Sequence, residues 1–299
     1  MSRFILFFLC CLLVGGAAAG HARQVVDQAG RTVSVPDPIR RVVSLAPSIT
    51  EIVYQLGRQD LLKGATLYSD TPPEAKLLPR VGSYVRIDVE KVIALKPDLC
   101  LAIKDGNPLH TVARLESLGI PVYVVNPRNL DEIVEMIIGL GTLLEAEKQA
   151  AEIAADMRQR IRKVVDRLDQ EAPRPGVFFQ IDAEPIVSAG RGTFIHELIV
   201  TAGGRNLAAD AGNAYPKLSW EDVLQYRPEV AIVASMAGGH SRESLLSGWY
   251  KWPQLPAVKN NRIHVVDAGL VDRPTPRLIE GLETFARLIH PELYRDQDE

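Results

Sequence analysis

The sequence is poor in several kinds of residue, and each shortage excludes some classes of protein. Only 6% of the 299 residues are aromatic, and three are cysteine. The formal net charge of -3 gives no sign of the basic face that a nucleic-acid-binding protein normally carries. Hydrophobic residues make up 46% and charged residues 24% of the chain, which excludes a disordered or fibrous protein. At ~150 residues per domain, the length allows two domains.

The first twenty residues have the pattern of an export signal. Arg3 precedes an apolar run over residues 4–14, and small residues follow at 15–20. These are the three parts of a secretory signal peptide. The apolar run is too short to span a bilayer, which needs ~20 residues, so a membrane anchor is the weaker interpretation. We predict a signal peptide over residues 1–22, cleaved near Ala19 to Ala22.

Removal of this signal would leave a single cysteine. Cys10 and Cys11 lie inside the apolar run. A lipoprotein would need small residues before the lipidated cysteine, and none precede these two, so the sequence does not indicate a lipoprotein. Cys100 lies in an apolar segment, which predicts a buried, inert thiol. With one mature cysteine no intramolecular disulfide forms, and a nitrogenase-like metal-cluster protein would lack its cysteine ligands.

Motifs of catalysis are also missing. None of the six histidines lies three or four residues from another, so the sequence has no zinc-type helix motif. It has no G-x-S-x-G nucleophile motif and no phosphate loop ending in Gly-Lys-Ser/Thr. The Gly190-Arg-Gly192 segment lacks the third glycine of a dinucleotide fingerprint and is interpreted as a turn. We predict no catalytic site, no metal site and no intrinsic cofactor.

What the sequence does contain is an alternation of apolar strands and helices. It runs over residues 42–125 and again over 176–289, which is typical of wound parallel sheets. In the helix that opens at Pro47, Ser48 and Glu51 have the spacing of a capping box. We therefore predict an α/β protein with two wound, Rossmann-like lobes.

The middle of the chain, over residues 130–169, has neither proline nor strand signal. Apolar residues recur there at a spacing of three to four, which predicts one long amphipathic helix preceded by a shorter one over 130–141. A helix of ~25 residues spans roughly 37 Å. We predict an N-terminal lobe at 23–128, a linking helical segment at 129–172 and a C-terminal lobe at 173–299. If the long helix instead dimerised, the protein would be a structural or signalling module.

An internal repeat supports two related lobes. Residues 90–99 (EKVIALKPDL) match residues 221–230 (EDVLQYRPEV) at a constant offset of 131 residues. In both copies an acid starts a helix, a basic residue and proline end it, and a second acid precedes a buried strand. We interpret the shared register as a duplication.

Several segments together resemble the helical-backbone class of periplasmic substrate-binding proteins, which serve ABC importers for cobalamin, haem and ferric siderophores. The resemblance extends over residues 24–294. It rests on five segments, namely 41–51 (RVVSLAPSITE), 68–73 (YSDTPP), 78–82 (LPRVG), 92–99 (VIALKPDL) and 274–277 (PTPR). The second of these segments looks most like the cobalamin-binding branch. The resemblance implies two lobes joined by a single long helix, with a ligand cleft between the lobes.

Carried over by position, the resemblance implies a set of ligand-binding residues. Tyr68 and Tyr84 would lie on the N-terminal side of the cleft, Tyr215 and Pro216 would face them, and Asp272 with Arg273 would lie near the ligand. Where the family pattern has tryptophans, this chain has Tyr84, Ile103 and Tyr215. Tyrosine joins an apolar ring to a hydrogen-bonding hydroxyl, which suits the faces and amide edges of a corrinoid. Two cleft tyrosines also suit haem, because a tyrosinate oxygen ligates ferric iron.

The two copies of the repeat each begin with a glutamate, Glu90 and Glu221. An acid in the first turn of a helix favours the helix dipole, which is a purely structural explanation. The resemblance implies more, because such acids in the family meet arginines on the two permease subunits. A pair related by pseudo-two-fold symmetry suits a two-fold transporter.

These observations combine into one functional hypothesis. The sequence predicts a monomeric periplasmic binding protein that delivers cobalamin to the permease dimer of an ABC importer. A haem or ferric-siderophore binding protein of the same class is the alternative. An exported α/β enzyme, such as a hydrolase, is less well supported.

Overall fold

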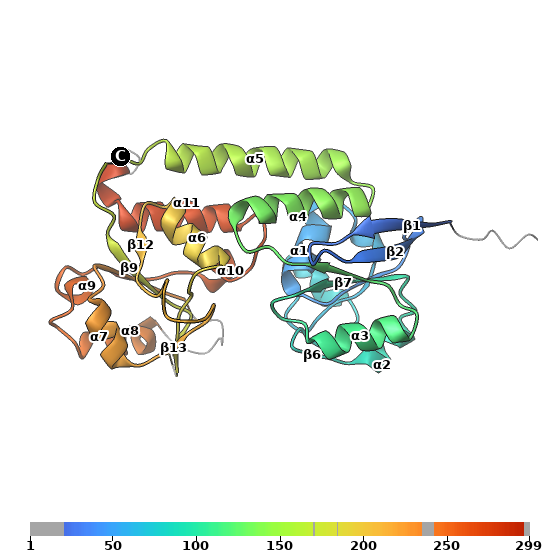
Figure 1. Cartoon of the computed structure of the whole chain (residues 1–299), viewed down its shortest axis with the longest axis horizontal. Coiled ribbons are helices and arrows are strands. Elements are labelled where there is room, and N and C mark those ends of the chain that lie inside the picture. Colours follow the sequence, from blue (N-terminus) through green and yellow to red (C-terminus); the bar gives the residue numbers. More distant parts are fainter. Residues whose placement is uncertain (1–20, 170, 184, 235–241, 296–299) are drawn as a thin grey trace, which may run out of the picture.

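The computed structural model describes residues 21–169, 171–183, 185–234 and 242–295 (Figure 1). The predicted signal peptide lies outside this range, apart from its last two positions. Within the described residues no helix is long and apolar enough to cross a membrane.

The N-terminal lobe is built on a four-stranded parallel sheet of order β4-β3-β7-β8. Its strands span Leu62–Gly64 (β4), Val42–Ser44 (β3), Leu99–Ile103 (β7) and Val122–Val125 (β8). The helices between them are α1 (Pro47–Gln55), α2 (Val89–Ala94) and α3 (Leu109–Ser117). Every residue of β7 is buried, as expected of a parallel strand covered on both faces. The predicted alternation is confirmed here.

The C-terminal lobe repeats this plan with the order β12-β9-β14-β15, again all parallel. Its strands span Arg205–Asn206 (β12), Gly176–Gln180 (β9), Val230–Val233 (β14) and Ile263–Val265 (β15). Its helices are α6 (Phe194–Thr201), α7 (Trp220–Tyr226), α8 (Arg242–Tyr250), α9 (Pro256–Lys259), α10 (Ala268–Val271) and α11 (Leu278–Ile289). The two wound lobes predicted from the sequence are therefore present.

The internal repeat has the same backbone in both copies. Lys96 after α2 and Arg227 after α7 both adopt left-handed backbone angles, with φ of 47° and 49°. The side chain of Asp98 accepts hydrogen bonds from the backbone N–H groups of Arg40 and Arg41, ahead of β3. At the equivalent place Glu229 accepts the N–H of Gly176 at the start of β9. Each acid thus fixes the neighbouring strand of its own sheet.

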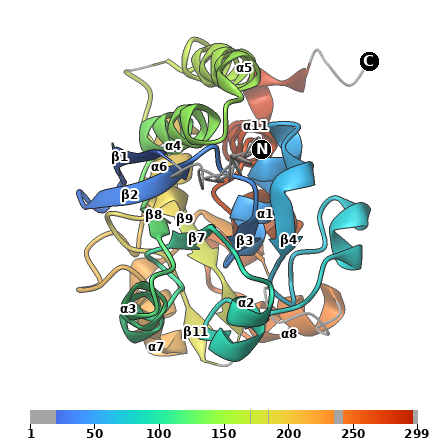
Figure 2. The same ribbon diagram turned by 90° about the vertical axis from the view of Figure 1, so that its right-hand side faces the viewer.

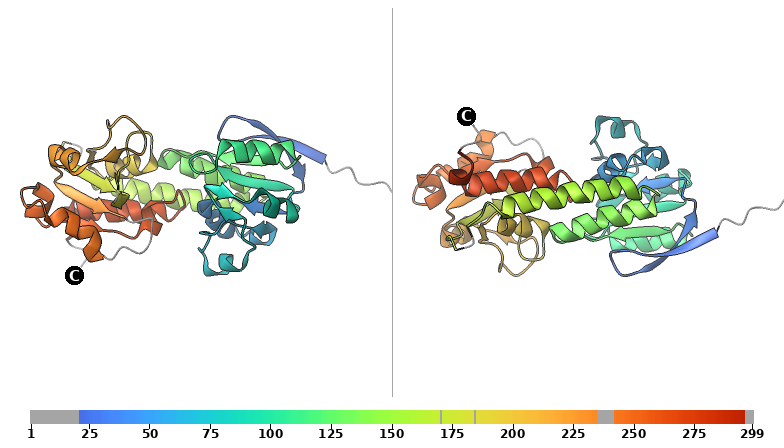
Figure 3. Two further views of the ribbon diagram at one scale, coloured as in Figure 1. Left: turned by 90° about the horizontal axis from the view of Figure 1, so that it is seen from below. Right: turned by 90° about the horizontal axis from the view of Figure 1, so that it is seen from above.

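Two antiparallel helices connect the lobes, α4 (Leu130–Leu143) and α5 (Glu147–Val165). The 19 residues of α5 make it ~28 Å long, shorter than the sequence predicted. Gly141 lets the two helices approach closely, because a Cβ there would collide with the Cβ of Ala150. In Figure 3, α4, α5 and α11 lie side by side along the long axis of the molecule, and Figure 2 shows α5 and α4 stacked above the sheets.

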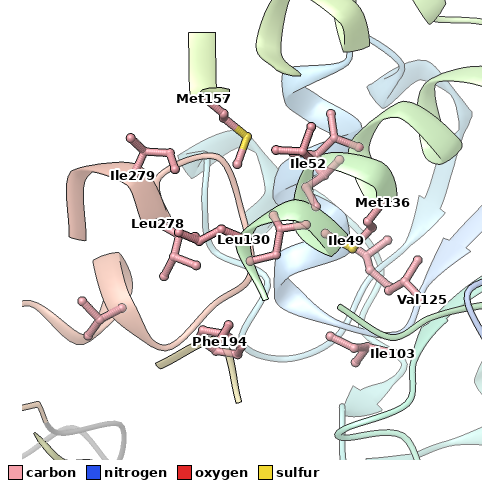
Figure 4. Packing of buried hydrophobic residues seen from close by; sticks show 14 of the residues in the cluster. Ile49, Ile52, Ile103, Val125, Leu130, Met136, Met157, Phe194, Leu278 and Ile279 are labelled. Atoms are coloured by element: carbon pink, nitrogen blue, oxygen red, sulfur yellow. The ribbon is translucent and has the colours of Figure 1, made fainter. Parts of the chain in front are cut away.

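One continuous hydrophobic core runs under this helical layer through both lobes. It joins side chains of α1, α4, α5, α6 and α11, and Figure 4 shows Ile52, Leu130, Met157 and Leu278 pointing toward one another. The same core includes one face of each parallel sheet, whereas the other faces pack in two separate clusters under α2–α3 and under α7–α9. The lobes are therefore fused on one side and separate on the other.

Several smaller elements were not predicted. They include the hairpins of β1 (His21–Val26) with β2 (Thr32–Asp37) and of β5 (Gly82–Ser83) with β6 (Arg86–Ile87), and helices α8, α9 and α10. Strand β11 (Ile186–Val187) pairs with β10 (Asp182–Ala183) and β13 (Lys217–Leu218) in a small antiparallel sheet. Short 3-10 turns cover Gln59–Leu61, Pro73–Leu77 and Pro291–Leu293.

The predicted capping box at Ser48 and Glu51 is wrong. The N-cap of α1 is Ala46, which makes no side-chain capping bond, and Pro47 occupies the first helical position. Proline at this position has no N–H, which removes one of the unpaired donors of the first turn. Ser48 and Glu51 are instead both buried, at 4% and 1% exposure.

Candidate functional site

Tyr68 lies in a loop that buried hydroxyl groups tie to α1. Thr50 Oγ1 lies 3.0 Å from Ser69 Oγ, which in turn lies 2.9 Å from Thr66 Oγ1. Arg80 Nη1 donates to the carbonyl oxygens of Thr66 and Ser69 at 2.8 and 3.0 Å. These bonds fix the loop from below, while Tyr68 at its tip is 57% exposed.

Tyr84 occupies the turn between β5 and β6. The buried side chain of Asn107 donates to the carbonyl oxygens of Tyr84 and Leu45 at 2.7 and 2.8 Å, and it accepts the N–H of Ile103 at 2.8 Å. The Tyr84 ring packs against Gly106, where a Cβ would lie 2.8 Å from the ring. Asn107 therefore fixes Tyr84 to the end of β7. Asn107 was not predicted as a site residue, although its place after a buried strand, between Gly106 and Pro108, is a signal in the sequence.

Tyr215 lies in a loop held by backbone hydrogen bonds. The N–H of Ser188 donates to the carbonyl of Pro216 at 3.0 Å, and that of Gly190 donates to Ala214 at 2.8 Å. Only glycine fits at position 190, because a Cβ there would collide with the loop backbone. Tyr215 is 39% exposed whereas Pro216 is buried, so Tyr215 is the member of this pair that presents a surface.

Asp272 and Arg273 follow α10, and Arg273 reaches the N-terminal lobe. Arg273 Nη1 forms an ion pair with Asp70 Oδ1 at 3.4 Å, and Nη2 lies 3.4 Å from the carbonyl oxygen of Tyr68. Both carboxylate oxygens of Asp272 are buried and have no hydrogen-bond partner among the described residues. Burial raises the pKa of Asp272 to about 7, which the nearby Arg273 opposes.

The residues from the two lobes form one electrostatic unit. Burial of its hydroxyl end raises the pKa of Tyr215 to about 12, and the charges of Asp105 and Asp272 and the neighbouring Tyr84 add to this effect. The Tyr215 phenol is therefore harder to ionise than an ordinary tyrosine. We call the set of Tyr68, Tyr84, Tyr215, Asp272 and Arg273 the interlobe site.

The interlobe site offers aromatic rings, two kinds of donor and one unpartnered acid. Such a set suits a ligand with flat apolar faces and amide or hydroxyl edges. Among the described residues no group of three or more histidine, cysteine, aspartate or glutamate side chains is arranged to hold a metal ion.

Glu90 and Glu221 lie on α2 and α7, and both are exposed. Asp88 caps α2, and Ser219 caps α7 in a capping box with Asp222, so both glutamates hold equivalent positions in the first turn. Figure 1 places α2 and α7 at the same side of the molecule, one on each lobe, opposite α5. The two carboxylates are therefore available to a single partner that approaches this side.

The tryptophans and the cysteine lie away from the interlobe site. Trp249 is fully buried and donates to Gln180 at 2.9 Å, and Trp220 packs edge-on against it at 5.3 Å between ring centroids. Trp252 packs beside Trp220, so all three stabilise the core of the C-terminal lobe. Cys100 is fully buried in β7, and burial raises the pKa of its thiol to about 12. The predicted inert thiol is confirmed.

Known proteins are similar to this chain in both sequence and fold. The family described as "Periplasmic binding protein" matches residues 42–270. A vitamin B12-binding protein of Vibrio cholerae is 35% identical over 251 residues, which cover 83% of this chain and 88% of the relative.

Two solved structures give the same picture. The periplasmic vitamin B12 binding protein of Vibrio cholerae aligns with a TM-score of 0.76 and 32% identity, over 86% of this chain and 99% of the other. A periplasmic heme binding protein of Pseudomonas aeruginosa also has a TM-score of 0.76, with 28% identity over 85% and 93% of the two chains. The chain belongs to the periplasmic binding protein family, as the resemblance in its sequence predicted.

Proposed function

We propose that this protein captures cobalamin at the interlobe site and delivers it to an ABC importer. The vitamin B12-binding relative, similar over most of both chains, is the strongest support. The interlobe site supports the same ligand, because its tyrosine hydroxyls and Arg273 can donate to corrinoid amide oxygens. In our proposal Asp272 acts on the ligand through its neighbours Arg273 and Tyr215, because its own carboxylate oxygens are buried.

A haem or ferric-siderophore ligand is the second candidate, and the heme binding neighbour supports it. Ligation of ferric haem by tyrosine requires the deprotonated phenol. The raised pKa of Tyr215, enforced by burial and by two nearby acids, opposes that deprotonation. The higher identity to the vitamin B12 binding structure, 32% against 28% for the heme binding structure, is the observation that favours cobalamin over haem.

Delivery follows from the arrangement of the lobes. In our proposal Glu90 and Glu221 dock on the two subunits of a permease dimer, one lobe on each. The continuous core under α4, α5 and α11 resists wide opening of the lobes. The transporter would then have to spread the lobes to release the ligand.

The remaining features of the proposal concern the mature protein. It is a periplasmic monomer and not an enzyme, and the lobes divide at 128/129 and 172/173. The signal peptide is removed by cleavage near Ala19. The pairing of Ala22 with Pro36 in the β1–β2 hairpin favours this site over one after Ala22, which would cut into β1.

Titration of the purified mature protein with cyanocobalamin, hemin and a ferric siderophore tests the ligand. Calorimetry and visible spectra should show binding of cyanocobalamin, weakened about tenfold in Y215F, the factor that ~1.4 kcal/mol represents. Y226F is the matched control, because that tyrosine packs on Phe178 in the C-terminal core. Tight hemin binding with a tyrosinate spectrum, and no heat with cyanocobalamin, would show that the ligand is haem and not cobalamin.

A further inference from the structure

Two consecutive polar residues of α1 serve opposite lobes. Thr50 bonds to Ser69 and so holds the Tyr68 loop in the N-terminal lobe. Glu51, the next residue, is 1% exposed and lies against the C-terminal lobe. The charges of Arg273, Arg277 and Glu280 act on its carboxyl group, as does the hydroxyl of Thr275. A single helix thereby contacts both walls of the interlobe site.

The C-terminal partner of Glu51 is a short, stiff segment over residues 272–277. It begins with Asp272 and Arg273 of the interlobe site and contains Pro274 and Pro276, each of which fixes its own backbone. Thr275, at its centre, is fully buried, and its N–H donates to the carbonyl oxygen of Arg273 at 2.8 Å. Any contact that holds Thr275 therefore also fixes the backbone that carries Arg273.

Where Glu51 of the N-terminal lobe meets Thr275 of the C-terminal lobe, buried polar atoms lack hydrogen-bond partners. Burial raises the pKa of Glu51, while Thr275 and the two arginines lower it. Glu51 Oε2 and Thr275 Oγ1 are both buried without a hydrogen-bond partner among the described residues. An unpartnered buried polar atom is costly, so two such neighbours favour any small lobe movement that joins them.

We propose that Glu51 is a positioning residue for the interlobe site. In our proposal the Thr275 hydroxyl donates to the Glu51 carboxylate after a small movement of the lobes, and this bond holds the 272–277 segment against α1 with Arg273 over the Tyr68–Asp70 loop. Glu51 itself is too deeply buried to touch a ligand. The proposal rests on the proposed function for its effect on affinity, but its effect on the 272–277 segment is independent of any ligand.

Cyanocobalamin titrations of E51A, E51Q and T275V test the effect on affinity. E51A and T275V should each weaken binding about tenfold, equivalent to ~1.4 kcal/mol. The double variant E51A/T275V should lose no more affinity than either single variant, because both substitutions remove the same contact between Glu51 and Thr275. E51Q keeps the shape and a hydrogen-bonding oxygen, so it should stay within about threefold of the wild type. E280Q, an exposed acid on α11 close to Glu51, is the matched control and should bind like the wild type.

Hydrogen exchange of the ligand-free proteins supplies the second measurement. The amides of Thr275 and Leu278, which bond within the segment, should exchange faster in E51A and T275V than in E280Q. Thermal unfolding identifies a variant that has not folded, in which case E51Q and T275V decide. Unchanged exchange, or additive losses of affinity in the double variant, would overturn the positioning role. A wild type that does not bind cyanocobalamin, with faster exchange still seen in E51A, would instead overturn the ligand assignment alone.

Discussion

The two lobes share a frame but support their ligand-facing residues in different ways. Both have a parallel sheet whose second and third strands are joined through an acid after a Pro-terminated helix, Asp98 in one lobe and Glu229 in the other. In the N-terminal lobe, side chains hold the presenting loops, as Thr50 and Asn107 do. In the C-terminal lobe backbone bonds from Ser188 and Gly190 hold the Tyr215 loop, and Asp272 has no hydrogen-bond partner among the described residues. The repeat thus preserves the scaffold, whereas each lobe builds its own part of the site.

The largest expected effect concerns the docking faces, where the lobes should be equivalent. E90K/E221K should abolish cobalamin uptake by cells while leaving the cyanocobalamin affinity of the purified protein unchanged, because both glutamates are exposed on α2 and α7 and neither belongs to the interlobe site. Each single variant should lose uptake to a similar degree if the lobes dock symmetrically.

E147K/E152K is the matched control, since it reverses two exposed acids on α5, on the opposite side of the molecule. Normal uptake by E90K/E221K would exclude docking through these acids. Loss in only one single variant would break the equivalence of the lobes.

The second prediction concerns the acids beside Tyr215, where the lobes should differ. The folded protein holds the pKa of Asp272 at about 7, above its ordinary value, so the folded state binds the extra proton. As far as Asp272 is concerned, the free energy of unfolding is therefore highest below about pH 4 and falls as the pH rises toward 7. D272N should remove this loss and raise the free energy of unfolding at pH 8 by on the order of 3 kcal/mol.

Urea denaturation between pH 4 and 8 measures the difference. D105N, which changes the exposed acid on the N-terminal side of Tyr215, should keep the wild-type pH dependence. Equal slopes for D272N and the wild type would mean that Asp272 carries no unusual proton.

The third prediction compares the acids that fix the central strands. D98A leaves the N–H groups of Arg40 and Arg41 without their acceptor, and E229A does the same to Gly176. Each should lower the free energy of unfolding by about 1–2 kcal/mol. Chemical denaturation gives the values, and a silent variant in one lobe would show that the repeat is no longer used equally.

The smallest effect concerns the left-handed residues of the repeat. Lys96 and Arg227 adopt positive φ angles that strain any residue with a Cβ, so K96G and R227G should each stabilise the protein by about 0.5–1 kcal/mol. Thermal unfolding of both variants should show a similar small increase in Tm. Destabilisation of either one would mean that its side chain makes a contact worth more than the strain.

Local patterns in the sequence predicted the elements and their order well. The segments 99–103, 176–180 and 230–233 are short apolar runs bounded by proline or glycine, and all three are central strands. Prediction failed where long-range contacts decide. Glu51 has the spacing of a cap, but its carboxyl is directed to a lobe that lies more than two hundred residues away in the chain.

The support of the site was equally hidden from the sequence. The tyrosines could be proposed individually from the sequence. Only the structure places Tyr215 near Asp105 and Tyr84 of the other lobe. The hydrogen bonds of Asn107 and the burial of Pro216 depend on how separate loops meet, which no local pattern encodes. Ligand contact for Tyr68, Tyr84, Tyr215, Pro216, Asp272 and Arg273 stays a prediction.

The shared core has a consequence for biosynthesis. α1 and α4 are translated long before α11, yet Ile52 and Leu130 belong to the same core as Leu278 and Ile279. Until the last helix has been made, the apolar stripe of the first one lacks part of its cover. A nascent chain of this design cannot complete its N-terminal half ahead of its C-terminal half. The shared core is therefore complete only once α11 has been made.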